Sequence, residues 1–303
     1  GSFQAIFGGA LESGSTDYTY LTSIAANNYF QQGGESLLVT RVTSGSFTSA
    51  TSSLIETGSG GINPSGLSPF VLETISEGEI MNTGDTEIAR GALTTGSADN
   101  VRWEIASVNT SSGVFSLLVR RGNDNNNQKV ILESYNNISL DPFAPNYISR
   151  AIGDITSNVV VAPDGSGTYL QESGSYPNIS NYLRVKKVNF NTPHYFNNDG
   201  NAKNEFTGSL PAIGSGSFGD AVGSNLNAQG ANNFYENIST QTQGLIGTDY
   251  TNAIQLLANQ DDYQYNVIST PGLTLTDHAF RVNLVKNNTI SRGDAIYVMD
   301  LVP

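Results

Sequence analysis

Residues 248–272 read TDYTNAIQLLANQDDYQYNVISTPG, and this stretch indicates the class of fold. Its apolar side chains recur with the spacing of one helix face, at Tyr250, Ala253, Ile254 and Leu257. Thr248 or Asp249 can cap the start of this helix, because their side-chain oxygens accept hydrogen bonds from the first turn. Residues 265–270 then form a short run that Pro271 and Gly272 close as a turn, which is typical of a strand. The stretch therefore predicts a helix followed by a strand.

The next residues repeat this order toward the C-terminus. A further helix is predicted by apolar residues at Ala279, Phe280, Leu284 and Val285. It leads into a continuous apolar strand at 295–299. Continuous apolar strands are typical of parallel sheets, which are buried on both faces.

The N-terminal residues predict a similar unit. Residues 3–7 form a short apolar run that stops at Gly8 and Gly9, as a buried strand does. Thr16 or Asp17 can cap a helix, whose apolar face would contain Leu21, Ile24, Ala25 and Tyr29. Gly33 and Gly34 end that helix, and the apolar run at 37–42 predicts a second strand. Strand, helix and strand together make a βαβ unit.

The middle of the chain predicts β structure instead. Strands are expected at 70–75, 86–93, 101–108, 114–121, 129–135 and 159–162. The loop 122–128 joins two of them as a long hairpin, residues 145–152 predict one short helix, and 165–233 predict long ordered loops. The simplest fold is a mixed α/β one: a discontinuous α/β core domain of residues 1–44 and 241–303, interrupted by a mainly β domain of residues 45–240.

Composition excludes several classes of function. The 303 residues include no Cys, which excludes disulfides, thiolate zinc sites and a cysteine nucleophile. Lys and Arg number 14 against 27 Asp and Glu, for a net charge of −13, so a general nucleic-acid partner is not expected. No apolar run is long enough to predict membrane insertion. The remaining class is an acidic globular protein rich in β structure and loops.

Three features of the sequence could carry chemistry: a glycine-rich motif, an aspartate after a strand, and two histidines. Residues 214–219 (GSGSFG) match GxGxxG, but no helix is predicted after them, which favours a structural loop over a nucleotide site. Asp300 follows an apolar strand as a magnesium ligand can, yet the chain has no GxxxxGK[ST] partner motif, so a loop-capping role is favoured. His194 and His278 lack metal-ligand spacing and are interpreted as structural or surface residues.

The acidic loops give no stronger signal. Asp141, Asp164, Asp261 and Asp262 are placed in loops, and residues 123–127 resemble a calcium loop only superficially. A glycine at the sixth position and a glutamate at the twelfth do not follow Asp124, so a hairpin tip is favoured. Sequons begin at Asn109, Asn137, Asn178, Asn237 and Asn287, as chance supplies in a chain rich in Asn, Ser and Thr. We therefore predict no catalytic, cofactor-binding or metal-binding residue, and no enzymatic activity.

Three stretches together resemble the contractile-tail sheath proteins of myoviruses, in particular the T-even-like branch. The first comprises residues 7–9 (FGG), 20–21 (YL), 28–34 (NYFQQGG) and 38–42 (LVTRV). The second and most specific comprises residues 120–124 (RRGND), 128–133 (QKVILE), 137–142 (NISLDP) and 145–148 (PNYI). The third comprises residues 256–257 (LL), 262–263 (DY), 268–273 (ISTPGL) and 292–297 (RGDAIY). In this comparison residues 214–219 are the family's glycine-rich lead-in to its last part.

The resemblance implies a structural subunit of a bacteriophage virion. Such a subunit is assembled in the host cytoplasm into a helical array around the tail tube, and its contraction drives the tube through the host envelope. The implied partners are other sheath subunits, the tail tube, the baseplate and the tail terminator. Both chain ends look trimmed relative to the family, so we expect a fragment that is monomeric by itself. A β-rich adhesin or glycan-binding surface module remains the alternative, and a nucleotide-binding enzyme is a third one.

Overall fold

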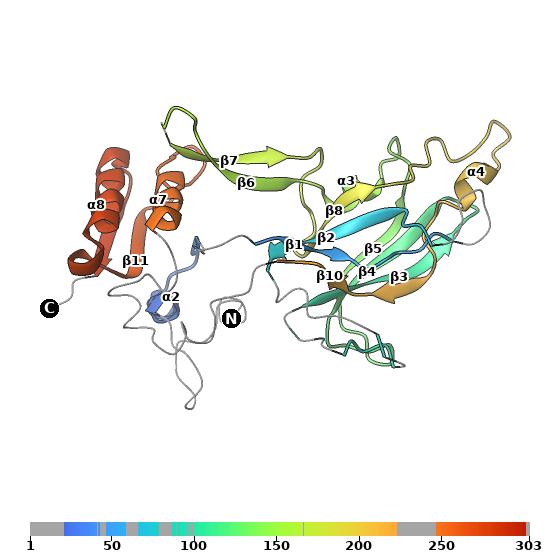
Figure 1. The fold of residues 1–303 in the computed structure, drawn as a ribbon, viewed down its shortest axis with the longest axis horizontal. Helices are drawn as coiled ribbons and strands as arrows, with labels where there is room; N and C mark the ends of the chain where they lie inside the picture. The colour runs from blue at the N-terminus through green and yellow to red at the C-terminus, as the bar shows by residue number, and fades with distance from the viewer. Residues whose placement is uncertain are drawn as a thin grey trace. The chain divides into compact units, whose positions relative to one another are not determined.

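The computed structural model describes residues 21–40, 42, 47–58, 66–78, 87–88, 90–94, 96, 98, 100–165, 167–222 and 247–300. The chain divides into two compact units (Figure 1). The first contains the described residues before 45, residues 158–171 and those from 247 onward. The second contains 47–157 and 172–222 within the described residues. The expected mixture of α and β structure is present.

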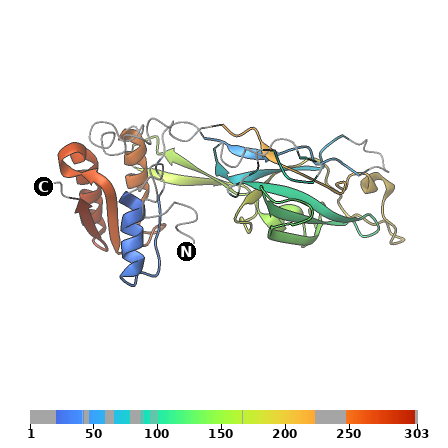
Figure 2. The same cartoon turned by 90° about the horizontal axis from the view of Figure 1, so that it is seen from below.

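The first unit contains a βαβ segment near the C-terminus. Strands β11 (Val267–Thr274) and β12 (Ile296–Asp300) pair in parallel, and helix α8 (Leu275–Arg292) connects them. Helix α7 (Gly247–Leu256) contacts α8, and α2 (Leu21–Gln31) contacts β11 (Figure 2). Their buried apolar side chains include Ile254, Val282 and Val285. The predicted order of helix, strand, helix and strand is confirmed here.

Details of these elements differ from the prediction. Helix α7 begins at Gly247, so Thr248 and Asp249 lie inside its first turn and not at its cap. Pro271 and Gly272 continue β11, with a shift of register between Ser269 and Thr274, because the following residues still find a partner in β12. The buried face of α8 is rotated from the expected one, since Ala279 and Phe280 are exposed while His278, Val282 and Val285 are buried.

The N-terminal part agrees only in its helix. Helix α2 ends as expected, with Gly33 in the left-handed region (φ 92°) and the Gly34 N–H donating to the Tyr29 carbonyl. The strand predicted at 37–42 is wrong for residues 37–40 and 42. These residues pair with no described strand, and Leu38 is 54% exposed. An apolar run becomes a strand only where a partner strand completes its backbone hydrogen bonds. The predicted strand at 3–7 and the cap at Thr16 or Asp17 lie outside the described residues.

Two four-stranded antiparallel sheets build the second unit. One has the order β10-β1-β2-β8, with bounds Phe218–Gly219, Ser49–Ser52, Phe70–Glu77 and Leu183–Val188. The other has the order β5-β4-β3-β9, with bounds Ile131–Ser139, Val114–Arg121, Val101–Asn109 and Gly214–Gly216. One apolar core draws on both sheets, and its Phe70 and Phe115 rings stack with centroids 5.4 Å apart. Helices α3 (Ile148–Ile152) and α4 (Asn204–Thr207) complete the unit.

Strands β6 (Thr156–Val161) and β7 (Thr168–Ser173) form a separate two-stranded antiparallel ribbon. Thr168 Oγ1 and the Gln255 side chain of α7 are hydrogen-bonded at 3.0 Å. The insertion predicted as 45–240 included this ribbon, whereas residues 158–171 belong to the first unit.

The predicted strands of the middle region are mostly present, as β2 to β6, and the predicted short helix is α3. The strand at 86–93 is wrong within the described residues. Glu87 and Leu93 bridge across a tight turn, in which Gly91 has φ 74° and reverses the chain. The long loops predicted at 165–233 are also wrong as far as residue 222. That segment contains β7, β8, α4, β9 and β10, which are short, and β8, β9 and β10 pair with strands far along the chain, namely β2, β3 and β1.

Candidate functional site

The glycine motif at 214–219 crosses from one sheet to the other. Gly216 pairs with Trp103 of β3, and Phe218 and Gly219 then pair with β1. A Cβ atom on Gly216 would overlap Ser53 Oγ and lie 2.6 Å from the Trp103 ring, which explains the glycine. The Trp103 indole N–H also donates to the Ser217 carbonyl at 3.2 Å. The sequence predicted a structural loop here; residues 214–216 and 218–219 instead form β9 and β10, and their backbone is committed to strand pairing.

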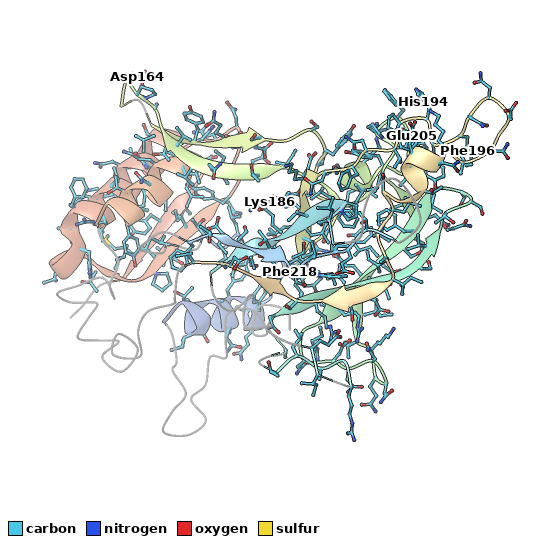
Figure 3. All side chains as sticks on the ribbon, turned by 45° about the vertical axis from the view of Figure 1, so that its right-hand side comes forward. Asp164, Lys186, His194, Phe196, Glu205 and Phe218 are labelled. Atoms are coloured by element: carbon cyan, nitrogen blue, oxygen red, sulfur yellow. The ribbon has the colours of Figure 1, made fainter. Side chains whose placement is uncertain are left out.

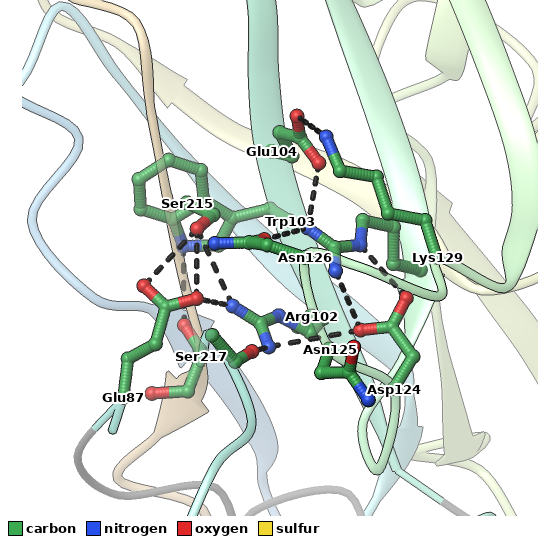
Figure 4. Close-up of polar contacts among 12 residues, drawn as sticks. Glu87, Arg102, Trp103, Glu104, Asp124, Asn125, Asn126, Lys129, Ser215 and Ser217 are labelled. Carbon is green, nitrogen blue, oxygen red and sulfur yellow. Dashed lines mark hydrogen bonds and ion pairs between the residues drawn. The ribbon is translucent and has the colours of Figure 1, made fainter. Parts of the chain in front are cut away.

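A cluster of charged side chains covers the face of β3 and β4 that points away from the core (Figure 4). Arg120 is fully buried, and its guanidinium donates two parallel hydrogen bonds, each 2.8 Å long, to the Asp124 carboxylate. A third hydrogen bond joins Arg120 Nη1 to Glu104 Oε2 at 2.6 Å, and a fourth reaches Asn126 Oδ1 at 2.9 Å. Lys129 donates to the other oxygen of Glu104 at 2.6 Å.

Arg102 extends the cluster to the 87–91 turn and to β9. Its guanidinium pairs with Glu87 and donates to the Gly91 carbonyl, and it donates to Ser215 Oγ at 3.3 Å. Ser215 Oγ in turn donates to the Glu87 carboxylate. Arg102 is fully buried, and its Nε has no hydrogen-bond partner among the described atoms.

The electrostatics of the cluster are balanced. Three cations, Arg102, Arg120 and Lys129, face three carboxylates, those of Glu87, Glu104 and Asp124. Burial acts to raise the pKa of Glu104, but hydrogen bonds from Lys129 and Arg120 outweigh it and hold that pKa below its ordinary value. Burial, followed by the charge of Arg120, lowers the pKa of Arg102. Because each charge of the cluster is paired with an opposite one, the cluster ties β3 and β4 to the loops that cover them.

Residues 123–127 form the tip of the β4–β5 hairpin, as expected. The Asp124 carboxylate is turned inward onto Arg120 and also accepts the Val130 N–H at 2.8 Å. Sequence reasoning missed this cluster. The feature that could have indicated it is that Arg102 lies directly opposite Arg120 on the neighbouring strand. Two like charges in this position repel each other, so nearby carboxylates are needed to compensate them.

The other candidate residues are scattered. His194 is an exposed loop residue of the second unit, whereas His278 is buried in α8 of the first, where its Nδ1 accepts the Thr274 N–H at 3.3 Å. Asp300 is the last residue of β12, opposite Thr274, and Asp164 lies in the turn between β6 and β7 (Figure 3). Asp261 and Asp262 follow α7 in a turn. Within the described ranges, no group of three or more His, Asp or Glu residues is placed to hold a metal ion.

The acidic residue Asp141 does adjoin a hollow. A cleft of about 470 Å³ lies in the second unit, between residues of the segments 112–114, 139–146 and 194–196. It brings together Asp141, Asn146 and His194, which are far apart in sequence. No pattern in the sequence indicated this cleft, because its three segments are joined only by the fold.

No protein-family model matches the chain, and no curated protein matches it either. In the part of the chain that the structure describes, none of the helices is long and apolar enough to span a membrane.

Proposed function

We propose that this chain is a structural subunit of a bacteriophage contractile tail sheath. In this proposal it repeats helically around the tail tube, binds other sheath subunits, and meets the baseplate and the tail terminator at the ends of the array. Its compact units move as rigid bodies when the sheath contracts and drives the tube through the host envelope. It would be assembled in the host cytoplasm and remain in the virion, and it would act without an active site or cofactor.

The sequence resemblance is one support for the proposal. Its most specific stretch, within residues 115–154, includes Arg120, Asp124 and Lys129 of the charged cluster. Its third stretch covers the end of α7 and parts of β11, α8 and β12.

The single observation that carries the proposal is an open apolar face on the small parallel sheet of the first unit. Ile296 and Val298 of β12 are 68% and 55% exposed and point to the same face, since they alternate with half-buried residues. Val267 of β11 pairs with Ile296 and is exposed as well. Adjacent apolar side chains in water favour a protein contact, as the repeating surface of an assembly requires.

Negative-stain electron microscopy of the protein that contains this chain tests the proposal. Long hollow tubes are expected from the unaltered protein. The V298K variant should fail to form them, because a charge would be buried in the subunit contact. The matched control V222K replaces an exposed valine of the second unit and should still form tubes. Dispersed particles from the unaltered protein at every salt concentration would contradict the proposal.

The second candidate function is a β-rich adhesin or glycan-binding surface module. The observation in its favour is the cleft beside Asp141 and His194, which combines aromatic rings with hydrogen-bonding groups.

A further inference from the structure

The cleft of about 470 Å³ has the size of a small-molecule site, for which volumes of about 300–1,000 Å³ are usual. Its residues come from the β3–β4 turn, the segment after β5 and the loop 194–196. Figure 3 shows His194 and Phe196 at the end of the second unit near α4. All of the residues that line it belong to this one unit.

The backbone beside the cleft is held in an unfavourable conformation. His194 has φ 51° and Asn137 has φ 55°, in the left-handed region, which is uncommon for non-glycine residues although Asn and His enter it more readily than most. Asp141 fixes the first of these, because one carboxylate oxygen accepts the His194 N–H at 3.0 Å and the other accepts the Phe143 N–H at 3.0 Å. The Asn146 side chain donates to the carbonyl of Asn137. Such strain persists where the surrounding structure enforces it, and it is concentrated at ligand sites.

Aromatic rings are left in water around the same hollow. The Phe143 ring stacks on the imidazole of His194, with centroids 4.8 Å apart and planes 6° from parallel, yet Phe143 is 69% exposed. Phe196 is 44% exposed and packs edge-on against the buried Tyr195, whose hydroxyl donates to the Thr110 carbonyl at 2.7 Å. Phe196 lines the cleft and is not needed to fill the core, so its ring is available to a ligand, whereas Phe143 adjoins the cleft through the imidazole on which it stacks.

The polar groups of the cleft define what the ligand can be. Asp141, Asn146 and Ser139 contribute a carboxylate, an amide and a hydroxyl, and no Lys or Arg lines the hollow. An anionic ligand would meet a carboxylate with no cation, on a chain of net charge −13. A ligand that offers both apolar C–H groups and several hydroxyls matches both the rings and the polar atoms.

We propose that this cleft binds a short neutral saccharide. Its ring C–H groups pack against His194 and Phe196, and its hydroxyls exchange hydrogen bonds with Asp141 and Asn146. The left-handed conformation of His194 places the imidazole at the cleft before the ligand arrives, which reduces the ordering that binding requires. The site lies within one unit, so it does not depend on the sheath assignment, and a sheath subunit could carry it on its outer surface.

Saturation-transfer NMR on the whole chain tests the proposal, with maltose, lactose, mannobiose and diacetylchitobiose as neutral probes and sialyllactose as the acidic one. At least one neutral disaccharide should receive saturation. H194G removes the ring at a φ that glycine adopts readily, and F196A removes an exposed ring, so both variants should fold. Each should weaken the affinity about five- to tenfold, as expected for the loss of one aromatic contact.

The control is Y169A, which removes an exposed aromatic ring from β7 and should leave the affinity unchanged. Three results would overturn the proposal: no saturation of any neutral disaccharide, equal affinity in H194G, F196A and the unaltered chain, or sialyllactose binding as tightly as the neutral probes. If H194G and F196A unfold at the same temperature as the unaltered chain, a loss of saccharide binding is due to the removed ring and not to unfolding.

Discussion

Replacing Asp124 by asparagine should destabilise the second unit more than any surface change. The carboxylate accepts two hydrogen bonds from Arg120 and one from the Val130 N–H, all at 2.8 Å. Asparagine keeps the size but removes the charge, and its amide N–H₂ would face the guanidinium. Arg120 is fully buried, so its charge would keep only Glu104 as an ionic partner. Breaking a buried pair in this way costs about 3–5 kcal/mol.

Urea unfolding followed by tryptophan fluorescence measures this cost. Trp103 is the only tryptophan of the chain and is buried in β3, one residue from the charged cluster, so its emission reports the second unit. With a slope of about 2 kcal/mol per molar urea, the D124N midpoint should fall by about 2 M. The control is K186Q, which removes an exposed lysine 3.4 Å from Glu73 and should cost under about 1 kcal/mol. A D124N midpoint within 0.5 M (about 1 kcal/mol) of the unaltered chain would refute the reasoning.

Three further outcomes are expected. G216A should destabilise the second unit by about 1–3 kcal/mol and shift Trp103 emission, because the added methyl group overlaps Ser53 Oγ and the indole; an unchanged urea midpoint would contradict this. The pKa of Glu104 is held below its ordinary value of 4.5, so its ionised form stabilises the fold above that pH, and this contribution is lost as pH falls through the lower folded pKa. As the pH is lowered, the urea midpoint of E104Q should therefore fall less steeply than that of the unaltered chain. An equal fall in both proteins would show that the ion pairs of Glu104 do not stabilise the fold. Phe280 is 63% exposed on α8, so the F280S variant should keep its free energy of unfolding, measured by thermal unfolding, within about 0.5 kcal/mol of the unaltered chain. A larger loss of stability would show that the ring is packed.

The elements that were predicted correctly are those that form because of their own residues and their immediate neighbours in the sequence. Helix α8 and strand β12 follow from the periodicity of their own residues, and α2 ends where Gly33 allows a left-handed turn. The β4–β5 hairpin was predicted because its two apolar runs flank an uninterrupted polar loop.

The elements that were missed depend on partners far along the chain. Strand β10 has two residues and exists because Phe218 pairs with Ser52, more than 160 positions earlier. The apolar run at 37–40 was predicted as a strand but is not one, since no described strand lies alongside it to complete its hydrogen bonds. Hydrophobicity alone cannot distinguish these cases, because a strand is a property of a pair.

The same limit applies to the candidate sites. Arg102 and Arg120 alternate with core residues such as Trp103 and Val119, as solvent-facing side chains of a two-sided sheet do. Such a pattern is typical of exposed arginines, whereas here the turn that contains Gly91 and the hairpin loop cover them. The cleft was equally hidden, because His194 and Asp141 are 53 positions apart and meet through one backbone hydrogen bond.

Polar satisfaction and apolar exposure point to different roles for the two units. In the second unit the buried charges are paired with one another and Trp103 packs against the glycine crossing, which ties the strands and covering loops of that unit together. In the first unit the described sheet has two strands and leaves Ile296 and Val298 in water, which is costly for an isolated chain. An exposed apolar face of this kind favours contact with another protein, which is the property that the proposed repeating assembly would use. The cleft of the second unit offers aromatic rings, hydroxyls and a carboxylate, and no Lys or Arg lines it, so a neutral ligand fits it better than an anion does.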